Sequence, residues 1–295
     1  MHAMFMGVKV CRTRHISSDA SFVASTLSGD YYVEIGRSSH IEVRVSISLI
    51  NRLTRPIRDV EISFLGLRED YHQEILEIRT SEEISSDRDV YGNIKHSMVI
   101  PILKPRRPYD VRIRYTIMTH PYKSALCPPR YMLDRKQVGR LLEDLPCQRA
   151  QHEIRSIASQ LCLSDSIGAI KAITLWVMRN IRYERTYTRD SASDTLKRGR
   201  GSCLSVSDLL VSMLRVCGIP ARVVRGLFMG RPHAWVEAYI PWGDLYVPLP
   251  IDALAGMVGS LGSPWISHYA EMSTRDKDAE CSMRSVAIKY SIGVL

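Results

Sequence analysis

Long apolar runs are missing from this chain of 295 residues. No stretch approaches the roughly 20 apolar residues that a helix needs to span a bilayer. The N-terminus also lacks the basic start of a signal peptide, because Lys9, Arg12 and Arg14 follow its apolar residues instead of preceding them. We therefore expect a cytoplasmic protein without a membrane partner.

Cysteines are few, and no two of them stand in a C-x-x-C pair. The seven are Cys11, Cys127, Cys147, Cys162, Cys203, Cys217 and Cys281. An odd number without paired spacing argues against a zinc ribbon and against a disulfide framework. We expect mostly reduced thiols, several of them buried as small apolar residues. No metal and no cofactor are predicted.

Charge of one sign is in modest excess, with 40 Lys and Arg against 31 Asp and Glu and a formal net charge of +9. The basic residues are dense only at residues 104–107 and 197–200. The chain has no C2H2 spacing, no RNP aromatic motif and no basic zipper. The excess positive charge is therefore interpreted as that of an ordinary basic protein surface. Nucleic acid is not a predicted partner.

Apolar residues alternate with polar or small ones in the first 120 residues. The clearest runs are 41–49, 60–64 and 111–117, and the turn-rich segment 88–93 separates two such runs. A period of two with one apolar face is typical of antiparallel strands over a shared core. We predict an all-β, sandwich-like N-terminal domain over residues 1–125.

The apolar spacing changes to three and four residues from about residue 131. Helices are predicted at 134–145, 149–162 and 165–181, the last with Ser164 and Asp165 as caps. Strand patterns return at 221–228, 234–240, 245–249 and 286–291. A Pro-rich stretch at 127–130 marks the boundary, so we predict a second, α+β domain over residues 126–295.

Cys203 lies at the start of a further predicted helix. Apolar residues follow helical spacing from Leu204 to Leu214, and Gly218 and Pro220 end the pattern. Gly199 and Gly201 precede it and allow a sharp turn. A helix N-terminus carries partial positive charge and unpaired N–H groups, which stabilise a thiolate and an oxyanion. Cys203 is therefore the predicted nucleophile.

A thiolate also needs a general base, and His233 is the candidate. It begins the apolar strand Pro232-His-Ala-Trp-Val-Glu-Ala-Tyr-Ile240. A histidine at a strand end is well placed to meet a helix N-terminus and shuttle a proton. Glu237 faces the same side but lies roughly 13 Å along the strand, too far for a direct hydrogen bond.

Three motifs together resemble the transglutaminase-like superfamily, which has the papain-like cysteine protease fold. They are Gly201-Ser-Cys203, the helix end Cys217-Gly-Ile-Pro-Ala-Arg222 and His233-Ala-Trp-Val-Glu-Ala-Tyr239. The resemblance implies an α+β core in which the nucleophile helix packs on an antiparallel sheet. The region ahead of it, with Asp89-Val-Tyr-Gly-Asn93, resembles the β-domain found ahead of microbial members.

The resemblance also implies a Cys-His-Asp triad, but the third member departs from the family pattern. The family has aromatic-Val-Pro-Val-Asp-Pro, whereas this chain has Tyr246-Val-Pro-Leu-Pro-Ile-Asp252. Pro250 occupies the expected position and has no side-chain acceptor. Asp252 is the candidate acid, which a bulge or a shifted register could bring to His233, and a backbone carbonyl or an amide is the alternative. Asp244 is expected in a hairpin turn.

Two functions follow from this sequence. The first is cysteine-dependent acyl transfer, with hydrolysis of an amide bond in a peptide or protein favoured over glutamine–lysine crosslinking, because neither a calcium site nor a secretion signal is evident. The second, motivated by Pro250, is a protein-binding module that keeps the fold without turnover. The oligomeric state and the substrate are not predicted.

Overall fold

Long antiparallel strands build the first half of the protein. The computed structural model describes residues 24–26, 29–31, 38–124, 129–143, 152–186, 189–262, 265–270 and 286–294. One sheet has the order β19-β3-β8-β5, with β3 at Ser39–Asn51, β5 at Gln73–Thr80, β8 at Pro108–Thr119 and β19 at Val286–Val294. The other has the order β4-β7-β6, with β4 at Ile57–Leu65, β6 at Ser85–Arg88 and β7 at Ile94–Leu103.

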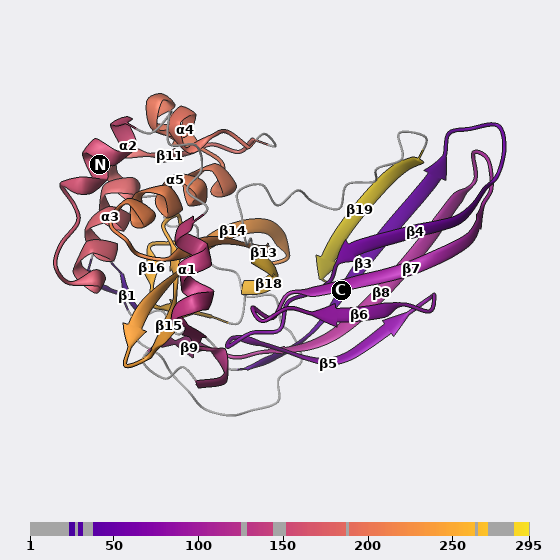
Figure 1. The fold of residues 1–295 in the computed structure, drawn as a ribbon, viewed down its shortest axis with the longest axis horizontal. Helices are drawn as coiled ribbons and strands as arrows, with labels where there is room; N and C mark the ends of the chain where they lie inside the picture. The colour runs from indigo at the N-terminus through magenta and orange to yellow at the C-terminus, as the bar shows by residue number, and fades with distance from the viewer. Residues whose placement is uncertain are drawn as a thin grey trace.

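The two sheets share one hydrophobic core, and the alternating pattern of the sequence accounts for it. Val45 and Ile113 point inward from the first sheet and Ile100 from the second, all fully buried. Their neighbours along each strand face outward, as the period of two predicts. The strand-rich N-terminal region is thereby confirmed, and Figure 1 shows its long strands side by side.

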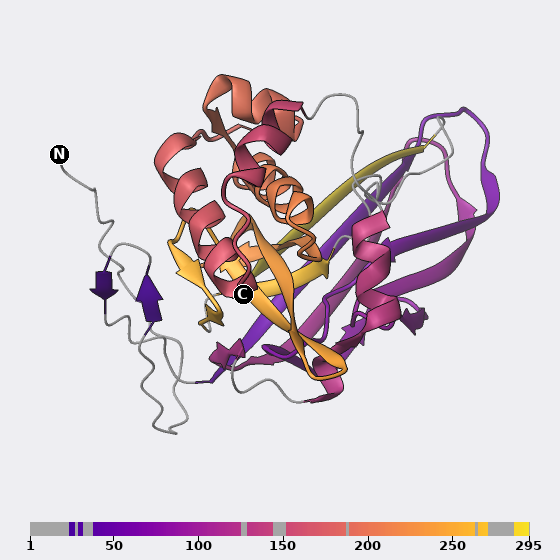
Figure 2. The same cartoon turned by 60° about the vertical axis from the view of Figure 1, so that its left-hand side comes forward.

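The last strand of the chain does not stay with the second half. β19 pairs antiparallel with β3 over its whole length, from Val286 opposite Asn51 to Val294 opposite Val43. Figure 2 shows it running along the sheet formed by the first part of the chain. The predicted strand at 286–291 therefore exists, but it belongs to the N-terminal sheet. Two strand pairings cross the predicted division at residue 125, namely β19 with β3 and Tyr122–Lys123 with Ser260–Leu261.

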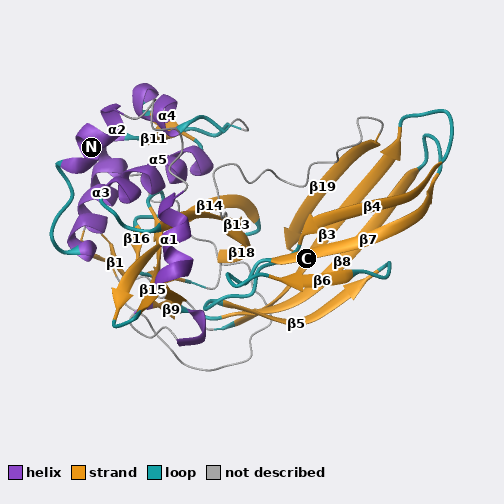
Figure 3. Ribbon diagram, in the orientation of Figure 1, coloured by secondary structure: helices purple, strands orange, loops and turns teal. Residues whose placement is uncertain are grey.

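Helices and an antiparallel sheet make up the second half, as Figure 3 shows. The helices are α1 Arg135–Glu143, α2 His152–Ser159, α3 Ser166–Asn180, α4 Ala192–Arg198 and α5 Cys203–Val216. The main sheet follows the order β10-β15-β14-β13-β18, with β16 pairing to β15. Its strands are β10 Leu133–Asp134, β13 Ala221–Phe228, β14 Arg231–Trp242, β15 Leu245–Asp252, β16 Met257–Val258 and β18 Trp265–Ala270. The predicted α+β class is thus confirmed.

Short elements complete the described part of the chain. β1 Ala24–Thr26 pairs with β2 Gly29–Tyr31, β9 Tyr122–Lys123 with β17 Ser260–Leu261, and β11 Arg182–Tyr183 with β12 Arg200–Gly201. A 3-10 turn, η2, covers Pro129–Tyr131. None of the helices in the described ranges is both long and apolar enough to cross a membrane.

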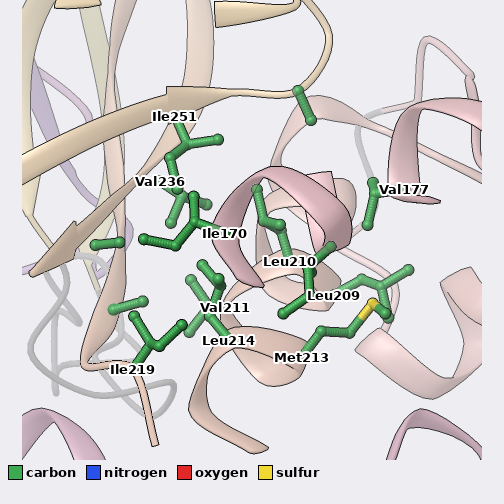
Figure 4. Packing of buried hydrophobic residues seen from close by; sticks show 14 of the residues in the cluster. Ile170, Val177, Leu209, Leu210, Val211, Met213, Leu214, Ile219, Val236 and Ile251 are labelled. Atoms are coloured by element: carbon green, nitrogen blue, oxygen red, sulfur yellow. The ribbon is translucent and has the colours of Figure 1, made fainter. Parts of the chain in front are cut away.

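Helix α5 lies at the centre of the second core. Leu209, Leu210 and Leu214 of α5 are buried against Val236 of β14 and Ile170 of α3 (Figure 4). Burying a Leu side chain stabilises a fold by roughly 1.5–3 kcal/mol, so this packing fixes the helix firmly on the sheet. The predicted cap of α3 is also confirmed, since Asp165 accepts hydrogen bonds from the N–H groups of Ile167 and Gly168. The position of the α5 N-terminus follows from this packing.

The expectation of reduced cysteines is wrong for two residues. Cys162, just after α2, forms a disulfide with Cys217 at the C-terminal end of α5. The number and spacing of cysteines in the sequence did not indicate this disulfide. The two cysteines are 55 residues apart and meet only through the packing of α2 on α5. Cys203 is the free thiol among the described cysteines.

Reduction of this disulfide should lower the free energy of unfolding by roughly 3–4 kcal/mol, because the bond closes a loop of 55 residues and restricts the unfolded chain. Urea denaturation with and without dithiothreitol measures the change. The Cys162→Ser/Cys217→Ser double variant is the control and should not respond to the reductant. An equal response of wild type and double variant would contradict a stabilising role.

The two halves are joined through buried contacts. Leu227 of β13 and Ile266 of β18 complete the hydrophobic core of the β-rich region. Arg68, in the loop after β4, donates two hydrogen bonds to Glu237 of β14, at 3.0 and 3.2 Å. Both side chains are almost completely buried. The β-rich region is therefore docked on the face of the core sheet that α5 leaves free.

Candidate active site

The loop before α5 is built for a tight turn, as predicted. Gly199 ends α4 in the left-handed conformation with a φ of 61°, which favours glycine. Gly201 lies against α4, since a Cβ atom at this position would be 3.0 Å from the Thr195 methyl group. Ser202 is the N-cap of α5, and its hydroxyl accepts a hydrogen bond from the Ser205 N–H. Cys203 thus becomes the first residue of the helix.

A neighbouring segment holds this loop in place. β11 pairs in parallel with β12, and the Glu184 N–H donates to the Gly201 carbonyl at 2.8 Å. The Arg198 guanidinium binds the carboxylates of Glu184 and Asp190 at 2.7 and 2.5 Å. Part of the basic density at residues 197–200 is therefore engaged in ion pairs within the loop, where it orders the backbone around the thiol.

His233 lies near the start of β14, with Gly226 of β13 opposite it. Its ring packs between aromatic side chains, with centroids 5.6 Å from Phe228 and 6.4 Å from Trp235. The imidazole also forms a hydrogen bond with the Cys203 thiol. The structure thus brings the predicted nucleophile and base together across the end of the sheet.

Asp252 reaches His233 without a bulge. The register of β14 and β15 places Glu237 opposite Pro250 and Val236 opposite Ile251, so Asp252 lies diagonally beside His233 on the same face. The His233 Nε2 atom is 2.7 Å from the Asp252 Oδ2 atom. That contact leaves Nδ1 as the ring nitrogen for the thiol. The three predicted residues therefore form a continuous Cys-His-Asp chain.

Both titrating groups of the pair have shifted pKa values. Burial of the Cys203 thiol opposes ionisation, but the hydrogen bond and charge of His233 and the backbone N–H groups of Ala234 and Leu204 outweigh it and lower the pKa of the thiol. Burial likewise disfavours the imidazolium, but Asp252 and Cys203 raise the pKa of His233 to about 10. The geometry favours a thiolate–imidazolium pair at neutral pH.

Sequence reasoning missed two residues that support the site and its surroundings, Trp265 and Glu237. The Trp265 indole Nε1–H donates to the Asp252 Oδ2 atom at 3.2 Å, although Trp265 lies in a segment with no recognised strand pattern. The role of Glu237 was also not predicted. It binds Arg68, Arg222 and Tyr239 and joins the two halves of the chain. The only sequence signal was a charged residue inside an apolar strand.

No metal site accompanies this arrangement in the described part of the chain, where no three His, Cys, Asp or Glu side chains are grouped to hold an ion. The described side chains of the site offer three chemical groups. These are a sulfur nucleophile at a helix N-terminus, an imidazole that moves a proton, and a buried carboxylate that orients the imidazole.

Comparisons with known proteins show what this chain is similar to. Residues 155–250 match the model of the transglutaminase-like superfamily. A candidate cysteine protease from Cytophaga hutchinsonii has a similar structure, with a TM-score of 0.54 and 17% identity over 88% of this chain and 89% of that chain. The periplasmic domain of TgpA from Pseudomonas aeruginosa gives a TM-score of 0.41 and 15% identity over 82% and 95%. No sequence among curated proteins matches this chain.

Proposed function

We propose that this chain, of which residues 155–250 match the transglutaminase-like superfamily, catalyses cysteine-dependent acyl transfer, with hydrolysis of an amide bond in a peptide or protein as its reaction. The observation that carries the proposal is the contact chain from Cys203 through His233 to Asp252. Similarity of fold alone would not suffice, because one fold hosts many functions.

The reaction follows from the three side chains. The Cys203 sulfur attacks the amide carbonyl carbon, and N–H groups at the start of α5 bind the oxyanion that forms. The His233 imidazolium then gives its proton to the leaving nitrogen as the C–N bond breaks. A thioester remains on Cys203. Water attacks it while His233 accepts a proton, and the carboxylic acid and free thiol are released.

The rival function, a binding module without turnover, was motivated by Pro250 in the expected acid position. The Asp252 contact with His233 removes that motivation, because a carboxylate is available two residues later.

Crosslinking of glutamine to lysine uses the same thioester and differs only in the second nucleophile. We propose hydrolysis over crosslinking and a peptide or protein as the substrate. The cytoplasmic location stays a prediction, and the Cys162–Cys217 disulfide is more typical of an oxidising compartment.

A peptide library tests this proposal. Wild-type protein is incubated with unstructured peptides and a primary amine, and the products are analysed by mass spectrometry against the Cys203→Ala variant. We expect cleaved or deamidated peptides with wild type only. Amine incorporation in place of hydrolysis would make crosslinking the reaction. Equal product profiles for wild type and Cys203→Ala, in which both proteins are folded, would instead support the binding module.

A further inference from the structure

Trp265 connects the candidate acid to the rest of the fold. It is the first residue of β18, the strand at one end of the core sheet, and its side chain is 6% exposed. One face of the indole packs on Phe228, with ring centroids 4.3 Å apart, and the Nε1–H points to the Asp252 carboxylate. Trp265 therefore contacts the candidate acid directly.

The Asp252 carboxylate is held by four donors. The Oδ1 atom accepts from the N–H groups of Leu254 and Ala255, both at 3.1 Å. The Oδ2 atom accepts from Trp265 and lies 2.7 Å from His233 Nε2. Backbone donors fix one oxygen, so the indole is the group that fixes the oxygen facing the imidazole. A buried carboxylate without this donor would have a freer Oδ2 atom.

The β-rich region holds Trp265 in turn. The His72 Nε2–H donates to the Trp265 carbonyl at 2.8 Å. The Gln73 amide accepts from the Ser267 N–H at 3.0 Å and donates to the Ser267 carbonyl at 2.9 Å. Asn93 pairs with the backbone of Ala270 in the same way, at 2.9 Å in both directions. Side chains of His72, of Gln73 at the start of β5 and of Asn93 therefore supply hydrogen-bond partners to the outer edge of β18.

We propose that Trp265 is a positioning residue of the active site. The β-rich region would then set the reactivity of Cys203 by holding β18, the strand that carries Trp265. The inference rests on the proposed function. It gives the β-rich region a task in the reaction: its loops hold β18, β18 places the indole, the indole orients Asp252, and Asp252 orients His233. A merely structural Trp265 would affect stability without changing how the thiol titrates.

The test is the alkylation rate of Cys203 by iodoacetamide as a function of pH, followed by mass spectrometry of the Cys203 peptide. Trp265→Phe keeps an aromatic ring beside Phe228 but removes the N–H. We expect the acid limb of the profile to move about one unit to higher pH, so that alkylation on that limb slows about tenfold, because below the thiol pKa a one-unit rise lowers the thiolate fraction tenfold. Trp242→Phe is the matched control, since Trp242 lies exposed in the β14–β15 hairpin, and it should behave as wild type.

Two further variants separate positioning from folding. Benzothienylalanine at position 265 keeps the ring shape and replaces the N–H by sulfur, so it should reproduce the Trp265→Phe shift in a protein of wild-type stability. In the Asp252→Asn background, Trp265→Phe should change the rate less than about twofold, because its partner carboxylate is gone. The same tenfold loss in both backgrounds would overturn the inference.

The failure of this inference differs from the failure of the proposed function. If wild-type Cys203 reacts no faster at about pH 6 than an ordinary thiol, the activated nucleophile is refuted and the inference falls with it. If wild-type Cys203 reacts fast and the Trp265 variants match it over the whole pH range, the proposed function stands and the positioning role is refuted.

Discussion

Asp252→Asn should slow amide hydrolysis by about 10²- to 10⁴-fold, by analogy with the loss of the acid from other nucleophile–histidine–acid sites. The carboxylate lies 2.7 Å from the His233 ring and raises its pKa. An amide keeps the size of the side chain but not its charge, so the imidazolium loses stabilisation and the pKa of Cys203 rises. Both the hydrolysis rate and the alkylation rate of Cys203 at neutral pH should fall.

Asp244→Asn provides the matched control for this prediction. Asp244 is exposed in the turn between β14 and β15, where the sequence placed it, and it should not affect either rate. Steady-state hydrolysis of a responsive peptide from the library and a thermal unfolding curve for each variant give the comparison. A folded Asp252→Asn protein with the wild-type rate would mean that His233 needs no carboxylate, and the proposed role of Asp252 would be wrong.

Glu237→Gln should lower the free energy of unfolding by about 3–5 kcal/mol, because it removes a buried negative charge that two buried guanidinium groups share. The Glu237 side chain has no exposed surface and binds both Arg68 and Arg222. Burial opposes the carboxylate, but these two arginines prevail and hold its pKa well below the usual range. Urea denaturation at neutral pH measures the loss.

The same ion cluster predicts how stability depends on pH. The folded-state pKa of Glu237 lies below the ordinary value of 4.5, so the contribution is complete above that pH and declines as the pH falls below it. Glu77→Gln is the control, because Glu77 forms an exposed pair with Arg79 at 2.7 Å and should leave the stability close to that of wild type. Similar losses for the two variants would refute the structural importance of the buried cluster.

Periodicity in the sequence was sufficient to predict much of the fold. Strands such as β3 and helices such as α3 each bury one continuous apolar face, and that face is visible in the spacing of residues. Contacts between distant segments were not predictable in this way. The pairing of β19 with β3 and the Cys162–Cys217 disulfide both depend on how separate elements pack, which no local pattern records.

The active site was predictable to the extent that its residues lie at element boundaries with clear local signals. Cys203 follows a glycine-rich turn and His233 opens a strand, so each could be identified from its own segment. The role of Asp252 was harder to predict, because the family pattern along this strand places the acid at Pro250. The position that matters is the pairing with β14, which brings Asp252 beside His233 in a regular register. Trp265 was missed because its partner is 13 residues away on another strand.

The pH dependence of Cys203 alkylation in wild type and in His233→Asn tests the central claim, that an imidazolium holds the sulfur as a thiolate. For wild type we expect a reactive thiol with an acid limb below the ordinary thiol pKa of 9.0, and loss of the ion pair only near the His233 pKa of about 10. In His233→Asn the acid limb should return toward 9.0. Superimposable profiles for the two proteins would contradict the account.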